Sequence, residues 1–232
     1  MIDVYYSRFG ANTFVIFNDK NEGILIDPGY NRDNCLTNHL KTINKNIKAI
    51  LITHGHIDHI YALKDILDLY PNAMVYISEE EKEFLSEPKL NLSNEYNDGY
   101  VKICSFVPKS LILINDNDII KECGFDIKVI TTPFHTKGSV CYYLDSEKAL
   151  FSGDTLFFST IGRTDLPTGS NKTIESSLRK IKSLPDGIKV YPGHGACTNL
   201  DREKKYNQYL KNIRFCGNFF VRGFKFNKIS SW

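Results

Sequence analysis

The sequence predicts an α/β fold in which helices cover the faces of β-sheets. Segments rich in β-branched and apolar residues alternate with segments of helical periodicity, which is the pattern of layered α/β proteins. Of the 232 residues, 42% are apolar, which is enough for a sizeable core in one domain. Histidines and aspartates follow several of the apolar runs, as expected for a site built at the ends of strands.

The first half of the chain predicts four strands with two helices between them. Strand patterns cover residues 12–18, 23–27, 47–52 and 73–78. Apolar residues at helical spacing mark the helices, at Leu36, Leu40 and Ile43 and again at Leu63, Ile66, Leu67 and Tyr70. His39 falls on the edge of the first helix, and we interpret it as a surface or packing residue.

Three polar segments follow these elements. Residues 79–83 are mostly glutamate and predict the start of a helix, because acidic side chains are favourable there; we interpret them as a solvated face. Residues 88–100 are Asn-rich and aperiodic, and predict a long loop at the border of the site. Residues 115–118 hint at a calcium loop, but Lys121 replaces the required Gly and Ile127 the bidentate acid, so we expect a turn.

The second half of the chain repeats the alternation of strands and helices. Strand patterns cover residues 125–131, 139–144, 149–152 and 188–191. A helix is predicted at residues 173–184, and a terminal helix at about residues 201–213. Both halves therefore present polar residues at strand ends.

A cluster of metal-competent side chains directly follows the strand predicted at residues 47–52. The sequence T-H-G-H-I-D-H places His54, His56, Asp58 and His59 within six residues, although the chain has only six histidines. A single His beside a Gly is usually a turn residue. Four such side chains together are different, because burying them unpaired would be costly. The cluster predicts a metal site.

The spacing within the cluster predicts two half-sites. His54 and His56 are two residues apart and face the same way in an extended turn, whereas Asp58 and His59 start a helix and face another point. Each half needs ligands from elsewhere, and the remaining candidates are His135, His194 and a potentially bridging Asp154. Paired ions about 3.5–4 Å apart lower the pKa of a shared water toward about 7. Zinc suits these ligands, and iron or manganese would fit them too.

At these residues the chain resembles the metallo-β-lactamase superfamily, whose pattern is T-H-x-H-x-D-H, T-P-x-H-T-x-G-S, G-D and G-H. The four blocks occur here in order. The resemblance implies a four-layer αββα sandwich of two mixed β-sheets with a dinuclear site. It assigns His54, His56 and His135 to one metal, Asp58, His59 and His194 to the other, and Asp154 to both. It also implies that Asp27, in I-D-P-G, supports the ligands by hydrogen bonding.

Within the superfamily the chain looks like the short, single-domain bacterial branch of glyoxalase II-like hydrolases. The segments around Asp154 and Arg163 carry this likeness. Phe134 stands where the family usually has Gly, and Lys137 where Pro is common; we expect a bulky Phe134 to narrow the pocket or to shift its loop. Longer glyoxalase II enzymes use a basic residue at the place of Arg163 on glutathione, but Asp165 does not match their aromatic partner.

The resemblance implies hydrolysis of a small-molecule thioester, such as lactoylglutathione, by metal-bound hydroxide. Asp58 would bind metal and also orient the hydroxide or take its proton. An alternative of the same fold is a persulfide dioxygenase with one iron on His54, His135 and Asp154. A third hypothesis, a nucleic-acid-binding or processing role, comes from residues 201–232, which carry eight Lys/Arg against two Asp/Glu.

The remaining expectations concern organisation and location. We assign residues 1–213 to the hydrolase domain and residues 214–232 to a C-terminal extension of unknown role. No run of 18 apolar residues occurs, and the first residues lack a signal-peptide pattern, so no membrane association and a cytoplasmic protein are predicted. The widely spaced cysteines are interpreted as free thiols. The oligomeric state cannot be read from the sequence.

Overall fold

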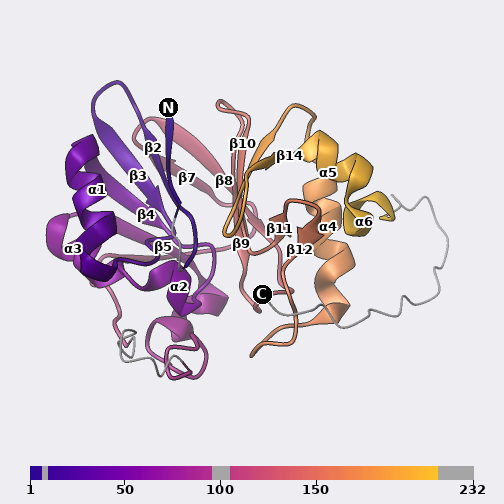
Figure 1. Ribbon diagram of the computed structural model, residues 1–232, viewed down its shortest axis with the longest axis horizontal. Helices are drawn as coiled ribbons and strands as arrows, with labels where there is room; N and C mark the ends of the chain where they lie inside the picture. Colours follow the sequence, from indigo (N-terminus) through magenta and orange to yellow (C-terminus); the bar gives the residue numbers. More distant parts are fainter. Residues whose placement is uncertain (7–9, 96–104, 214–232) are drawn as a thin grey trace.

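The computed structural model describes residues 1–6, 10–95 and 105–213, which form two mixed β-sheets packed face to face (Figure 1). The first sheet has the order β1 (Ile2–Tyr5), β2 (Thr13–Phe17), β3 (Glu22–Ile26), β4 (Asn46–Leu51), β5 (Met74–Ser78) and β6 (Leu111–Ile114). The second has the order β14 (Thr198–Asn199), β13 (Lys189–Pro192), β10 (Ala149–Gly153), β9 (Val140–Leu144), β8 (Phe125–Thr131) and β7 (Ile119–Glu122). A two-stranded ribbon joins β11 (Leu156–Phe157) to β12 (Thr160–Ile161).

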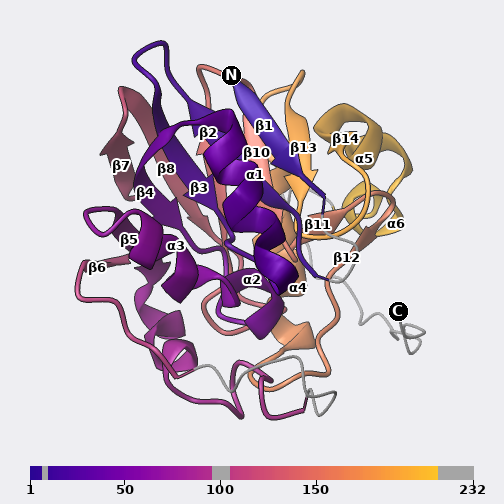
Figure 2. The same cartoon turned by 60° about the vertical axis from the view of Figure 1, so that its left-hand side comes forward.

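Helices cover the outer face of each sheet. The first sheet is covered by α1 (Cys35–Ile43), α2 (Ile57–Ile60) and α3 (Leu63–Leu69), with the 3₁₀ helices η1 (Arg32–Asn34) and η2 (Glu79–Leu85). Figure 2 shows α1 lying across this sheet. The second is covered by α4 (Ile174–Lys182), α5 (Leu200–Tyr206) and α6 (Gln208–Lys211), with η3 (Asn171–Thr173) before α4. The expected four-layer αββα sandwich is confirmed.

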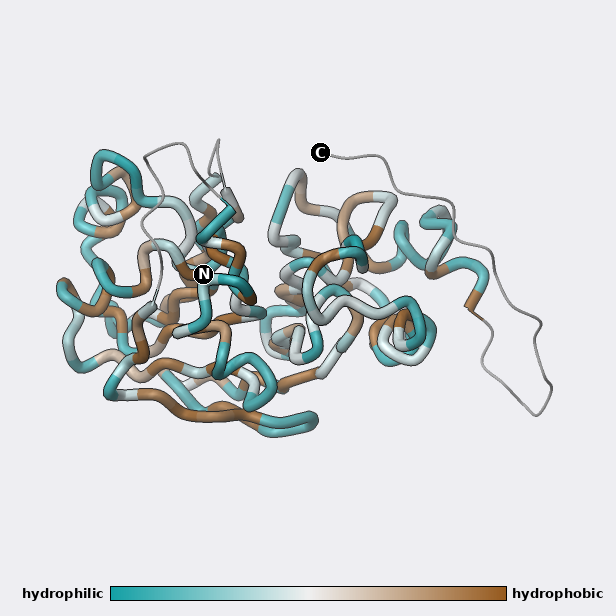
Figure 3. The backbone as a smooth tube through the Cα atoms, turned by 90° about the horizontal axis from the view of Figure 1, so that it is seen from below, coloured by the Kyte–Doolittle hydropathy of each residue, from teal (hydrophilic) through white to brown (hydrophobic). Residues whose placement is uncertain are grey.

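Three apolar clusters hold the layers together. The central cluster lies between the sheets and joins Phe14 and Leu51 of the first to Tyr142 and Phe151 of the second. The other two pack the helices onto the outer faces. Because the interior strands β9 and β10 are buried at every residue, their sequences are mostly apolar, and β4 is apolar over its buried end, Ala49 to Leu51. Figure 3 shows brown, hydrophobic stretches alternating with teal, hydrophilic ones along the backbone, with teal at many of the outer loops.

The structure departs from the sequence-based expectation mainly at sheet edges. Six strands were not predicted: the edge strands β1, β6 and β7, of four residues each, and the two-residue strands β11, β12 and β14. β1 and β7 are partly exposed and contain charged residues, so their apolar pattern is weak, whereas β6 has the wholly apolar sequence LILI and did carry a strand signal. The single terminal helix expected at residues 201–213 is wrong in one respect: it divides at Asn207, whose backbone is extended and whose side chain caps α6 by accepting from the Tyr209 amide.

Two further outcomes concern the loops and helices. Residues 115–118 form the expected turn, in which the Asp118 carboxylate accepts from the Asn115 amide. In the described part of the long loop, Asn91 is buried, and its carbonyl accepts from the Ile57 amide at the start of α2. None of the helices in the described segments is long and apolar enough to cross a bilayer.

Candidate metal centre

The histidine cluster lies immediately beyond the carboxyl end of β4. Extended backbone at His56 ends the turn, and α2 begins at the next residue, so His54 and His56 lie in the turn whereas Asp58 and His59 lie on the helix. The three histidine side chains are at most 3% exposed. The remaining candidates follow other strands of the second sheet, namely His135 after β8, Asp154 after β10 and His194 after β13. The four strand ends therefore deliver all seven side chains to one region.

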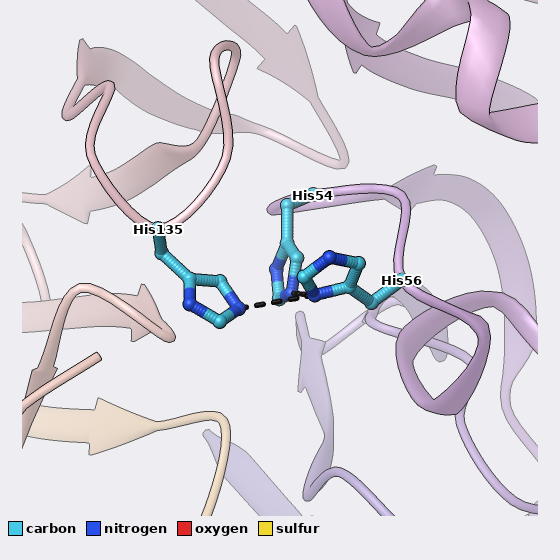
Figure 4. A group of neighbouring side chains, drawn as sticks. All are labelled: His54, His56 and His135. Atoms are coloured by element: carbon cyan, nitrogen blue, oxygen red, sulfur yellow. Dashed lines mark hydrogen bonds between the residues drawn. The ribbon is translucent and has the colours of Figure 1, made fainter. Parts of the chain in front are cut away.

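His54, His56 and His135 form what we call the first group (Figure 4). His56 Nδ1 lies 3.1 Å from His54 Nε2 and 3.0 Å from His135 Nε2. His135 Nδ1 donates to the carbonyl oxygen of Arg163 at 2.8 Å, so in the neutral ring the lone pair is on Nε2 and faces its partners. One proton on His56 Nδ1 could serve only one of the two facing nitrogens, whereas a cation would satisfy all three.

Asp58, His59 and His194 form the second group. His194 Nε2 lies 3.0 Å from Asp58 Oδ2, and His59 Nε2 lies 3.8 Å from the same oxygen. This group is more open than the first, because the side chains of His194 and Asp58 are 39% and 24% exposed. Within the described residues the centre is therefore more exposed to solvent on this side.

Asp154 lies between the two groups and presents one carboxylate oxygen to each. Its Oδ1 is 3.3 Å from His59 Nε2 and 3.7 Å from His194 Nε2 in the second group. Its Oδ2 is 3.4 Å from His135 Nε2 in the first. A carboxylate in this position has the geometry of a bridging ligand.

The polar atoms of the centre are poorly satisfied by one another. Within the described residues, three buried atoms of the centre lack a hydrogen-bond partner: His56 Nε2, His59 Nε2 and Asp154 Oδ1. An unsatisfied buried polar group costs about 1–3 kcal/mol, and more when it is charged. Two of these atoms, His59 Nε2 and Asp154 Oδ1, lie 3.3 Å apart. Imidazole nitrogens and carboxylate oxygens are ligands for zinc, iron and manganese, so the residues present fit divalent metal ions.

The pKa shifts of His54, His56 and the two carboxylates also suit cations. Burial lowers the pKa of His54 well below its usual value and that of His56 to about 3. Burial opposes ionisation of Asp154, but His194 and His59 outweigh it and hold its pKa well below the usual range. Burial likewise opposes ionisation of Asp58, and again His59 and His194 lower its pKa overall. At neutral pH the two histidines are neutral and both carboxylates are charged, as metal ligands must be. Burial disfavours the charged form of His59 and His194, but the neighbouring carboxylates outweigh it and raise the pKa of each, so a cation would displace a proton from each ring.

Asp27 is a buried carboxylate that contacts Thr53, just before the histidine cluster, and His59 at its end. Its Oδ2 accepts from His59 Nδ1 at 2.8 Å and from the Thr53 hydroxyl at 2.7 Å, and its Oδ1 accepts from the Thr53 amide at 2.8 Å. The bond to Nδ1 leaves His59 Nε2 pointing at Asp58 and Asp154. Asp27 itself adopts a left-handed backbone conformation, with φ 50°.

The role of Arg163 in substrate binding stays a prediction, whereas Phe134 lies differently from what the sequence suggested. The Arg163 guanidinium makes two bonds to Asp165, at 2.6 and 2.7 Å, and only its carbonyl touches the centre, through His135. The expectation that Phe134 narrows the pocket is wrong, because its ring is fully buried in the cluster beneath α4, with Leu156 and Ile174. The side chain points into the core although its neighbour His135 points to the centre.

Two residues that support the centre gave no usable signal in the sequence. Asn12 Nδ2 donates to the carbonyls of Pro192 and Gly195, both at 3.0 Å, and so holds the loop that carries His194. Glu81 is fully buried and bonds to both loops of the first group. The interpretation of residues 79–83 as a solvated face is therefore wrong at Glu81, because backbone amides from distant segments satisfy its carboxylate. Glu79, Glu80 and Glu83 are exposed as expected.

Comparisons with known proteins agree with this arrangement. The model of the metallo-beta-lactamase superfamily matches residues 6–194. Hydroxyacylglutathione hydrolase GloC of Haemophilus influenzae is 32% identical over 207 residues, which cover 89% of this chain and 95% of the relative.

Two solved structures extend the comparison. The crystal structure of BLEG-1 B3 metallo-beta-lactamase has a TM-score of 0.83 at 34% identity, and covers 91% of this chain and 100% of its own. The structure of TTHA1623 in a di-iron-bound form has a TM-score of 0.77 at 27% identity, and covers 88% of this chain and 98% of its own.

Proposed function

Because the chain belongs to the metallo-beta-lactamase superfamily and is a metallo-hydrolase of that superfamily, we propose that its reaction is thioester hydrolysis of the glyoxalase II type. The observation that carries the proposal is the convergence of two ligand groups on the shared carboxylate of Asp154. The similarity to a hydroxyacylglutathione hydrolase over almost the whole length of both chains supports the thioester class.

We assign the first ion to His54, His56 and His135, the second to Asp58, His59 and His194, and Asp154 to both. Two divalent ions there would supply a water of lowered pKa and a Lewis acid for an acyl carbonyl. Zinc is the proposed metal, and the ligand set also fits iron, which a similar structure binds as a pair, or manganese.

The chain's own groups would position the reactants. The charged Asp58 carboxylate is next to His194 and partly open to solvent, so it can hold the attacking water by a hydrogen bond and accept its proton. The substrate would approach over Asp58 and His194, since the first group is buried. Phe157, whose ring centroid lies 6.2 Å from that of His194, would border this approach.

Arg163 is a weaker candidate for a substrate contact. A carboxylate of glutathione would have to displace Asp165, which already occupies the guanidinium with two hydrogen bonds. The proposal therefore specifies a thioester but not its thiol. If glutathione does displace Asp165, an Arg163→Ala variant should change KM for glutathione esters.

The dioxygenase alternative uses part of the same centre. One iron could be held by His54, His135 and Asp154, because His135 Nε2 is 3.4 Å from Asp154 Oδ2. The complete second group favours the hydrolase, since three further ligand-competent side chains would otherwise have no role. The nucleic-acid hypothesis depends largely on residues 214–232, which lie outside the described residues.

One experiment separates these functions. Purified protein of measured metal content is assayed against a panel of thioesters that includes lactoylglutathione, while oxygen consumption is followed with a persulfide substrate. We expect thioester hydrolysis without oxygen uptake, and loss of both bound metal and turnover in His56→Ala. Oxygen uptake that depends on the persulfide, with no thioester cleaved, would replace the hydrolase by the dioxygenase.

A further inference from the structure

Glu81 is a buried carboxylate in an otherwise exposed acidic segment. It lies in η2, where its neighbours Glu79 and Glu80 are exposed, yet Glu81 itself has 0% exposure. Burying a carboxylate is costly unless donors satisfy it, and burial raises the pKa of Glu81 to about 7. A purely apolar or amide side chain would avoid this cost if the position needed only to be filled.

The donors to Glu81 come from the two loops that carry the first group. Its Oε2 accepts from the Gly55 amide at 2.8 Å, and Gly55 separates His54 from His56. Its Oε1 accepts from the Gly138 amide at 2.8 Å, three residues after His135. Thr136, next to His135, also lowers the pKa of this carboxylate, against the effect of burial. One carboxylate therefore joins two segments that are about 80 residues apart in sequence.

Close packing on η2 leaves both loops little freedom to move toward Glu81. A Cβ at Gly55 would lie 2.2 Å from Phe84 Cβ, and a Cβ at Gly138 would lie 2.7 Å from Glu80 Cβ. Both contacts are too short for any side chain, so each loop lies directly against the helix. The Phe84 ring also faces His56, with 6.1 Å between the ring centroids. η2 therefore fixes the positions of the loops that contain Gly55 and Gly138.

We propose that Glu81 is a positioning residue of the metal centre, which fixes the separation between the His54–His56 turn and His135 and thereby tunes the first ion's affinity. This inference rests on the metal centre proposed above. The second group takes no part in these bonds: Asp27 orients His59, and Asn12 holds the loop of His194. The effect of Glu81 should therefore be confined to one of the two ions.

The chemistry of the side chain makes the inference testable. Each carboxylate oxygen accepts from one amide, so Glu81→Gln would place an amide NH₂ against one of these N–H groups and lose at least one bond. Glu81→Asp keeps the charge but is one methylene shorter, and cannot reach both loops at once. Glu80→Gln is the matched control, because Glu80 is exposed on the same helix.

The experiment is a titration of the metal-free full-length proteins with Zn²⁺ and, for its visible spectrum, with Co²⁺. We expect Glu81→Gln to bind one ion about 10–100-fold more weakly than wild type, the usual effect of losing a support outside the ligand shell, and the other ion normally. Glu80→Gln should match wild type. Thermal unfolding of each metal-free protein shows whether the fold is retained, and if Glu81→Gln does not fold, the same titration of Glu81→Asp decides.

Two results would overturn the inference. In the first, the Glu81 variant binds both ions as wild type does. In the second, both affinities fall in parallel with the stability of the metal-free protein, which would mean a structural role alone. Failure of the wild-type protein to bind any metal would instead contradict the proposed function, so the two failures are distinguishable.

Discussion

At the scale of single residues, the centre depends on which nitrogen of each imidazole carries a proton. His59 shows this clearly: burial disfavours its charged form, but Asp58, Asp27 and Asp154 together raise its pKa well above the usual value. The Asp27 carboxylate accepts a hydrogen bond from His59 Nδ1, so Nε2 is directed at Asp58 and Asp154. Asp27 thus fixes the orientation of the His59 ring, and a cation would displace the proton on Nε2.

The first prediction follows from this pair. Asp27→Asn replaces the acceptor of the His59 proton by a weaker, neutral one, so we expect metal affinity to fall about 10–100-fold. Asp3→Asn is the control, because Asp3 makes a similar 2.7 Å contact to His39 away from the centre. The measurement is metal content after dialysis against a competing chelator. Equal retention of metal in both variants would argue against the role of Asp27.

The second prediction concerns the pH dependence of stability. The pKa of Glu81 is raised by burial from its usual 4.5 to about 7. Between these values the native state holds a proton that the unfolded state has lost, so stability falls as pH rises through this window. The free energy of unfolding of metal-free wild type, relative to Glu81→Gln, should therefore decrease by a few kcal/mol from pH 4.5 to pH 7.

Urea unfolding of both metal-free proteins at a series of pH values measures this difference. Titration of the histidines contributes to both proteins alike and cancels in the comparison. A difference that stays constant across the window would show that Glu81 has an ordinary pKa in the folded protein.

At the scale of elements, ends of strands are the positioning devices. β10 and β13 run parallel, so their carboxyl ends place Asp154 and His194 side by side, and the Gly193 amide bonds to the Gly153 carbonyl at 2.8 Å. Glycine is required between them, because a Cβ at Gly193 would lie 2.3 Å from Asp154 Oδ1 and 2.7 Å from His59 Cε1. The backbone at Gly193 therefore packs directly against Asp154 and His59.

The third prediction tests this close packing at Gly193. Gly193→Ala should displace Asp154 and His59, so metal binding and turnover fall by at least tenfold although no ligand is changed. Gly195→Ala is the comparison: it has open space but φ 76°, so it should cost about 1–2 kcal/mol of stability and keep its metal. Metal stoichiometry together with chemical unfolding separates the two effects. Full metal content in the Gly193→Ala variant would contradict the requirement for glycine at this position.

At the scale of the whole molecule, the described residues up to Ile213 complete the three apolar clusters. Ile213 and Leu210 pack in the cluster of the second sheet, and Lys182 Nζ donates to their carbonyls at 2.6 and 2.9 Å. No contact described at the centre depends on residues beyond this point. The assignment of residues 1–213 as the hydrolase domain stays a prediction.

The fourth prediction is that deletion of residues 214–232 leaves the metal stoichiometry and thioester turnover unchanged. The clusters and ligands described above all precede this segment, which is the physical reason. Size-exclusion chromatography, metal analysis and the thioester assay measure the outcome. Salt-dependent retention on RNA that disappears with the deletion would revive a nucleic-acid role, and loss of turnover would contradict the domain assignment.

The sequence alone determined the layered fold, most interior strands and the set of ligand-competent residues, because each of these follows from local pattern. Apolar runs report strands buried on both faces, and the T-H-G-H-I-D-H cluster reports a site through residues that lie close together in the chain. The edge strands β1 and β7 escaped detection since half-exposed strands carry little pattern, whereas the apolar run of β6 was a usable signal.

Only the tertiary structure decided how the chain surrounds the site. The burial of Glu81 depends on amides at Gly55 and Gly138, and the orientation of Phe134 depends on the helix packed beneath it. Asp154 faces both groups because β10 lies beside β13 in the second sheet, opposite the first. Such contacts join residues far apart in sequence, and no local pattern encodes the donors that a distant loop will bring.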